Sequence, residues 1–251
     1  MLGFLDSNRE ERFFCAILLH VLLTPGESQE GVLGLINEKS GLRLIPSDLE
    51  CYVEVAALRD AWRLLGDPGK WTAELYEARR DVLHKLLKTV CGYSGNLSDF
   101  DDVLRQHAFF WSSNSMQKLV SPGRWPIDQL ESGTTFGDPT QLRRLKWAFN
   151  SKPDLLLLSG QHGVLIEAKA ASGFGKNAHS GYDQQDVQEL IADLFPIVTR
   201  GLVTGPLRCI TLTNKSADGS LRWKDIAGVV ARGDIGDFAY DAMQRASDVW
   251  S

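Results

Sequence analysis

The chain has 251 residues, of which 43% are hydrophobic and 24% charged, and its formal net charge is −5. These values are typical of a globular protein with one well-buried core, or with one core and a helical lobe. The net charge argues against a protein that coats nucleic acid, and the four widely spaced cysteines, with no C-x-x-C pair, argue against a zinc site or a disulfide framework.

The N-terminal half is expected to be helical. Apolar periodicity and Gly or Pro breaks predict helices at about 9–23, 28–39, 47–65, 71–90 and 98–110. The apolar run within the first of them is too short to span a bilayer, so a cytoplasmic location without a membrane partner is expected. Residues 111–145 are interpreted as a linking or lid segment between a helical region, 1–110, and a core, 146–251.

Two apolar strands carrying ionisable residues are predicted next, at 153–158 and 163–170. Gly160 at the first central position of the turn between them favours a two-residue type II′ hairpin. That turn places Asp154 directly opposite Glu167, and strand alternation points Glu167 and Lys169 to the same face. Like charges at opposed positions repel, so these three groups are unusual in a hairpin that is otherwise Leu, Ile and Val.

A divalent cation would remove this repulsion. Oxygen ligands from Asp154 and Glu167 suit Mg²⁺, for which Mn²⁺ is expected to substitute. Lys169 would stay cationic beside the two carboxylates and orient a water molecule or stabilise a phosphorane-like transition state. The alternative is that Asp154 merely starts a strand after proline, while Glu167 and Lys169 form a solvated ion pair.

The C-terminal third is predicted to continue the sheet and its helices. A helix is expected at roughly 182–195, a strand at 207–213, a turn at 214–219, mixed structure at 221–230 and a helix at 234–250. Basic residues flank the hairpin, and Lys152 and Lys176 are candidates for contacts with substrate phosphate.

Pro153-Asp154, followed by Glu167-Ala168-Lys169 at the end of an apolar strand, resembles the PD-(D/E)xK nuclease superfamily. The resemblance covers roughly residues 150–195. It implies an α/β, restriction-endonuclease-like fold, in which a mixed sheet is flanked by helices, here with a largely helical N-terminal half. The predicted order of hairpin, helix and strand is compatible with that core.

The resemblance also implies roles for individual residues. Asp154 and Glu167 would be the metal-binding acids, together with the main-chain carbonyl of Ala168, and Lys169 would be the catalytic lysine. A glutamine from the following helix, Gln184 or Gln185, would reach the site.

An acid from an N-terminal helix is a further feature that the resemblance implies. Glu11 is the candidate here, with Glu10 beside it. Glu50 and Glu54, expected one helical turn apart, are rivals that the sequence does not separate from it.

The expected function is metal-dependent hydrolysis of phosphodiester bonds by a nuclease acting on DNA, in phage defence, restriction or repair, with RNA as the other possible substrate. A homodimer or a defence or repair complex is compatible with the resemblance. The alternative is a catalytically inactive module of the same fold that binds nucleic acid or a protein partner.

Overall fold

The computed structural model describes residues 11–66, 70–112, 115–126, 136, 138–169, 176–177, 182–214 and 220–248. By contacts between residues the chain divides into two compact units, each built from separate stretches of sequence. Unit 1 consists of Met1–Val55, Pro153–Phe174 and Gly205–Ser251, and unit 2 of Ala56–Lys152 and Gly175–Thr204. The two units therefore cut across the three regions expected from composition.

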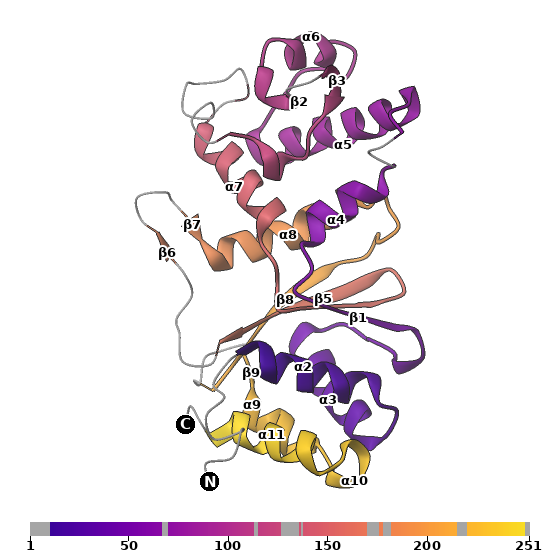
Figure 1. Ribbon diagram of the computed structural model, residues 1–251, viewed down its shortest axis with the longest axis vertical. Helices are drawn as coiled ribbons and strands as arrows, with labels where there is room; N and C mark the ends of the chain where they lie inside the picture. Colours follow the sequence, from indigo (N-terminus) through magenta and orange to yellow (C-terminus); the bar gives the residue numbers. More distant parts are fainter. Residues whose placement is uncertain are drawn as a thin grey trace. The chain divides into compact units, whose positions relative to one another are not determined.

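Unit 1 is an α/β unit built on a mixed five-stranded sheet (Figure 1). Its strands lie in the order β1-β4-β5-β8-β9, with β1, β4 and β5 antiparallel and with β5, β8 and β9 parallel. The elements of this unit are α2 (Glu11–Leu23), α3 (Glu27–Ser40), η1 (Pro46–Asp48), β1 (Leu49–Val53), β4 (Leu155–Ser159), β5 (His162–Lys169), β8 (Leu207–Thr213), β9 (Leu221–Arg222), α9 (Trp223–Val229), α10 (Arg232–Ile235) and α11 (Asp237–Asp248).

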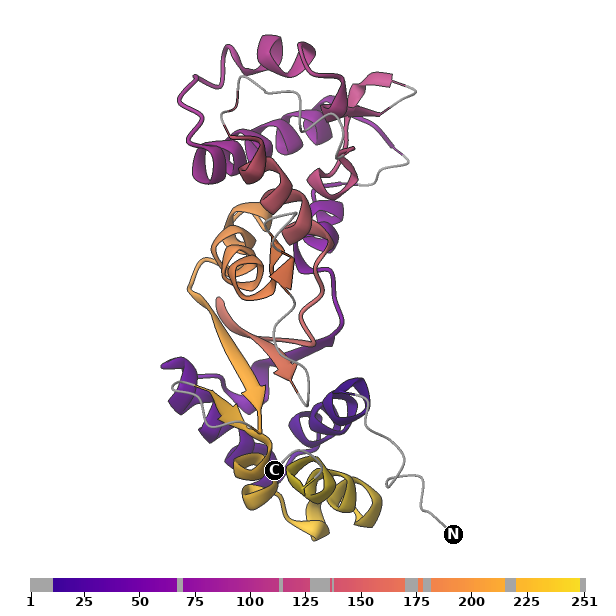
Figure 2. The same cartoon turned by 90° about the vertical axis from the view of Figure 1, so that its left-hand side faces the viewer.

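Helices gather on one side of this sheet and enclose the core of unit 1 (Figure 2). Strand alternation sends Leu155 and Leu157 of β4, with Val164 and Ile166 of β5, into this core. The helices contribute residues such as Phe14, Leu18, Ile36, Trp223 and Met243. Leu156 and Leu165, which strand alternation points to the opposite face, are buried as well. Burial of both faces explains why the predicted strands at 153–158 and 163–170 read as nearly continuous apolar runs.

One predicted helix, 47–65, is wrong. Its first part is η1 and then β1, and only α4, from Ala57 to Leu64, is helical. Leu49, Cys51 and Val53 pack against the core of unit 1, whereas Glu50 and Tyr52 are exposed. This period of two is a strand signal. Tertiary pairing with β4 outweighs the sequence Ser47-Asp48-Leu49-Glu50, which resembles the capping box at the start of a helix.

Unit 2 is mostly helical, with two short two-stranded sheets. Its elements are α4 (Ala57–Leu64), α5 (Ala73–Cys91), α6 (Phe100–Arg105), η2 (Ala108–Phe110), β2 (Trp111–Ser112), β3 (Ser115–Leu119), η3 (Pro122–Arg124), α7 (Pro139–Asn150), β6 (Lys176–Asn177), β7 (Tyr182–Asp183) and α8 (Gln184–Val198). Helix α7 is not predicted by the residue pattern, although Asp138 caps it by accepting a hydrogen bond from Thr140 N at 2.8 Å and Pro139 occupies its first turn.

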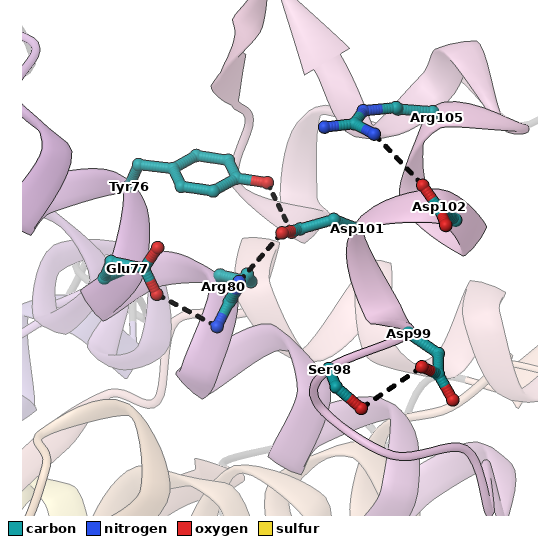
Figure 3. Close-up of polar contacts among 8 residues, drawn as sticks. All are labelled: Tyr76, Glu77, Arg80, Ser98, Asp99, Asp101, Asp102 and Arg105. Carbon is teal, nitrogen blue, oxygen red and sulfur yellow. Dashed lines mark hydrogen bonds and ion pairs between the residues drawn. The ribbon is translucent and has the colours of Figure 1, made fainter.

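A polar network joins α5 to α6 within unit 2 (Figure 3). Tyr76 donates its hydroxyl to Asp101 over 2.7 Å, and Arg80 donates to the other oxygen of Asp101 over 2.8 Å. Arg80 also pairs with Glu77 at 3.0 Å. Both oxygens of the Asp101 carboxylate are therefore engaged.

No helix in the part of the chain that the structure describes combines the length and apolarity needed to cross a membrane.

Candidate active site

The β4–β5 hairpin has the register that the sequence predicts. Leu155 pairs with Ile166 and Ser159 with His162, so continuing the ladder by one position places Asp154 opposite Glu167. Gly160 has φ 57 whereas Gln161 has no positive φ, as a type II′ turn requires. The two carboxylates predicted to converge therefore lie on neighbouring strands of one unit.

Asp154 is fixed by the strand opposite it. Its Oδ2 accepts a hydrogen bond of 2.7 Å from the backbone N–H of Ala168. Burial raises the pKa of the Asp154 carboxyl, the Ala168 hydrogen bond and the charge of Lys169 oppose that rise, and the charges of Glu11 and Glu54 add to it. The carboxylate is thus oriented by backbone and placed among other acids.

Glu167 and Lys169 form a buried ion pair. The Lys169 Nζ lies 2.7 Å from Glu167 Oε1, and the two side chains are 12% and 8% exposed. Burial, and then the charge of Asp154, raise the pKa of Glu167 to about 7, although its contact with Lys169 acts in the opposite direction. Burial lowers the pKa of Lys169, but its hydrogen bond to Glu167 and the surrounding acids outweigh burial and raise it.

A third acid, Glu54, comes from β1. Continuing the β1–β4 register by one position places Glu54 opposite Asp154, and its backbone N–H donates to the Asp154 carbonyl at 3.1 Å. The Glu54 carboxylate forms an ion pair with Arg12. Glu54 also has φ 48, a left-handed conformation that costs free energy in a residue other than glycine, and backbone strain of this kind clusters at functional sites.

Glu11 supplies a fourth acid, from the first turn of α2, which packs against β1 and β5. Its charge raises the pKa values of Asp154, Glu167 and Lys169. The buried thiol of Cys15, also on α2, is influenced by the same acids. Burial raises its pKa first, and Asp154, Glu11, Glu167 and Glu54 raise it further.

We call these four acids, Glu11, Glu54, Asp154 and Glu167, the acid cluster. Its donor set fits a hard divalent cation, because Mg²⁺ takes one or two protein carboxylates and completes its shell with water and substrate phosphate. Within the described residues, no three His, Cys, Asp or Glu side chains lie close enough to form a ready-made metal-binding group. Asp154 and Glu167 instead accept hydrogen bonds from Ala168 and Lys169.

The other candidates separate into two groups. Glu50 is exposed on β1 and accepts a hydrogen bond from Tyr52, so the structure does not bring it to the acid cluster. Lys152, Gln184, Gln185 and Lys176 belong to unit 2. Within that unit Lys152 is exposed, Gln184 and Gln185 begin α8, and Lys176 begins β6. Glu10 lies outside the described residues.

Two members of this site were not identified from the residues alone. Glu54 is one of several rival acids in the sequence, and no residue pattern marks Arg12. A signal for Glu54 was the alternation of Leu49, Cys51 and Val53, which is typical of a strand but does not give the register of that strand against β4. A scan against protein-family models found no match, and searches of curated proteins and of solved structures also found none.

Proposed function

We propose that the protein is a metal-dependent nuclease with a restriction-endonuclease-like fold, acting on DNA. The observation that carries the proposal is the pairing of Asp154 with Glu167 across one hairpin, with Lys169 in contact with Glu167. The chain order of hairpin β4–β5, helix α8 and strand β8 parallel to β5 is compatible with that fold.

The chemistry follows from the charges of the site. Asp154 and Glu167 would hold a divalent cation, Mg²⁺ by preference, which supplies a water of lowered pKa and neutralises charge on a phosphodiester. Ala168 N–H orients Asp154 by its hydrogen bond. Lys169, which contacts Glu167, would provide a buried cation beside the reacting phosphate. Glu11 and Glu54 add negative charge that favours metal binding.

Cleavage assays test this proposal. The purified chain is incubated with linear, branched and single-stranded DNA in Mg²⁺, in Mn²⁺ and in EDTA. We expect metal-dependent cleavage that falls by about a hundredfold or more in Glu167→Gln and in Lys169→Met, because each removes a charge at the reacting centre. Glu50→Gln, which removes an exposed acid from the same sheet, should retain wild-type cleavage. Absence of cleavage on every substrate, or undiminished cleavage by both site variants, would contradict the proposal.

A second function is favoured by one observation. Asp154 and Glu167 are already engaged by Ala168 and Lys169, as expected if the module has the same fold but holds no metal and binds nucleic acid or a partner protein.

Calorimetric titration with Mn²⁺ separates the two functions. A nuclease site should bind Mn²⁺ about tenfold more tightly at pH 8 than at pH 6, because Glu167, with its pKa of about 7, must lose its proton. An inactive module should give no heat that depends on Asp154.

A further inference from the structure

Unit 2 contains a cavity of about 280 Å³ between α4, α5 and the segment from β3 to η3. We call it the arginine pocket because of the cations that line it. These cations are Arg59, Arg63, Arg79, Lys118 and Arg124. No acidic residue lines the pocket in the part of the chain that the structure describes. Asp60 lies outside this lining, at 3.6 Å from Arg59 and 3.7 Å from Arg63, and offsets part of the positive charge.

Arg79 is the buried member of this set, with 6% of its surface exposed. Its guanidinium carbon lies 5.4 Å from the ring centroid of Trp62 and 5.4 Å from that of Trp71, so two indoles hold it in place. One nitrogen donates to the carbonyl of Leu119 at 3.3 Å. Within the described residues no carboxylate pairs with it, which is unusual because buried cations are normally paired.

The neighbouring arginine shows the usual arrangement. Arg80 follows Arg79 on α5 and is held by Asp101 and Glu77 (Figure 3). Two successive arginines of one helix therefore differ in how their charge is compensated. Two carboxylates of the protein compensate the charge of Arg80. The charge of Arg79 is available to an anion bound in the arginine pocket.

Unused hydrogen-bond donors point to the same conclusion. The buried Nε of Arg79 and the buried Oγ of Ser121, two residues that line the pocket, have no hydrogen-bond partner within the described chain. Buried donors are nearly always satisfied by protein, water or ligand. An anion with several acceptor oxygens would satisfy these donors and the unpaired guanidinium together.

We propose that the arginine pocket binds a phosphate group. A nucleic-acid strand and free phosphate are the two sources of this chemistry, and a strand would make the pocket a second contact of the proposed nuclease with its substrate. Only the choice of a nucleic-acid strand as the source of phosphate rests on the proposed function. The phosphate site itself rests on the residues of unit 2 that line the arginine pocket.

Binding measurements in EDTA test the proposal without cleavage. Arg79→Met is the direct variant, but it alters a buried side chain and its fold must be checked by thermal melting. The double variant Lys118→Gln/Arg124→Gln removes two exposed cations of the pocket. The control, Lys85→Gln/Lys88→Gln, removes two exposed cations of α5 that do not line the pocket. Each protein is titrated with a labelled single-stranded oligonucleotide by anisotropy and with inorganic phosphate by calorimetry.

We expect Lys118→Gln/Arg124→Gln to bind the oligonucleotide about tenfold more weakly at low salt, and the slope of log K against log salt to shrink by about 0.7. The α5 control should match wild type. If inorganic phosphate gives binding heat that the pocket variants lose, while the oligonucleotide binds equally to all variants, the site is supported and its ligand is free phosphate. Equal oligonucleotide binding by both double variants, with no heat from phosphate, would overturn it. Loss of cleavage with intact pocket binding would contradict only the proposed function.

Discussion

At the scale of single residues, the Glu167 carboxylate of the candidate site costs free energy when it ionises, because it is buried beside another acid. This carboxylate is buried in β5 opposite Asp154, and Lys169 contacts it with a compensating charge. Burial and Asp154 together raise its pKa from 4.5 to about 7. The folded chain therefore holds the Glu167 proton more tightly than the unfolded chain does, and ionising this group at neutral pH weakens the fold.

The sign of the pH dependence follows from this shift. Because the folded pKa is raised, the stabilising contribution of protonated Glu167 is complete below about pH 4.5 and is lost as the pH rises to about 7. Glu167→Gln mimics the protonated side chain. We expect this variant to be more stable than wild type at pH 8, by on the order of 3 kcal/mol, and to match wild type near pH 4.

Thermal unfolding of both proteins between pH 4 and pH 9 measures this difference. Glu50→Gln is the matched control for the loss of one glutamate from the same sheet, because Glu50 lies exposed on β1. A constant offset between Glu167→Gln and wild type at all pH values would show that the Glu167 carboxyl does not titrate near neutral pH.

The residues that could be predicted from the sequence are those fixed by local geometry. Gly160 and the apolar runs around it determine the hairpin register, and the register determines that Asp154 faces Glu167. Glu54 depends instead on the pairing of β1 with β4, across about a hundred intervening residues. No local pattern encodes such a pairing, so Glu11, Glu50 and Glu54 stayed equivalent until the fold separated them.

At the scale of elements, the β4–β5 hairpin depends on a glycine within a strand. A Cβ on Gly163 would clash with the Leu157 carbonyl oxygen and would lie 2.7 Å from Leu158 Cδ2. A glycine within a strand often marks such a close approach of backbone. The backbone of β4 has little freedom to move, because β1 and β5 pair with it on both sides.

Gly163→Ala should therefore destabilise the chain. We expect the free energy of unfolding to fall by about 1–3 kcal/mol, because the hairpin must shift to admit the methyl group. Gly34→Ala on α3 is the control, since nothing lies within 4 Å of its added Cβ. It should raise the free energy of unfolding by about 0.5–1 kcal/mol, as alanine does in an exposed helix. Denaturant unfolding of the two variants checks both signs, and equal stability of the two would contradict the argument.

Elements whose signals were local and consistent were also the ones that could be predicted. The strand β8 has the bounds expected of it, 207–213. Helix α7 was not predicted because its cap, Asp138-Pro139, follows a segment rich in Ser, Gly and Thr that favours an extended interpretation. The sequence of β1 favours a helix because Ser47 and Glu50 imitate a helix start, whereas pairing with β4 decides its conformation.

At the scale of the whole molecule, charge is divided unevenly between the two units. Acidic residues outnumber basic ones in unit 1, which holds the acid cluster, and the two kinds are nearly balanced in unit 2, which holds the arginine pocket. A nucleic-acid strand would therefore be repelled by the acid cluster in the absence of metal and attracted by the arginine pocket. Divalent cations would remove the repulsion at the acid cluster, but they would not be needed for attraction at the arginine pocket.

This division predicts opposite effects of one substitution with and without metal. In EDTA, Asp154→Asn should bind a single-stranded oligonucleotide roughly two- to fivefold more tightly than wild type, because one negative charge is removed from the acid cluster. In Ca²⁺, a hard cation used here to occupy the site, binding by wild type should strengthen more than binding by the variant, so that their order reverses. Anisotropy titrations at low salt measure both effects, with Glu38→Gln, an exposed acid on α3, as the control for net charge. If Asp154→Asn and Glu38→Gln responded alike to Ca²⁺, Asp154 would not be a metal ligand, and the nuclease proposal would lose its main support.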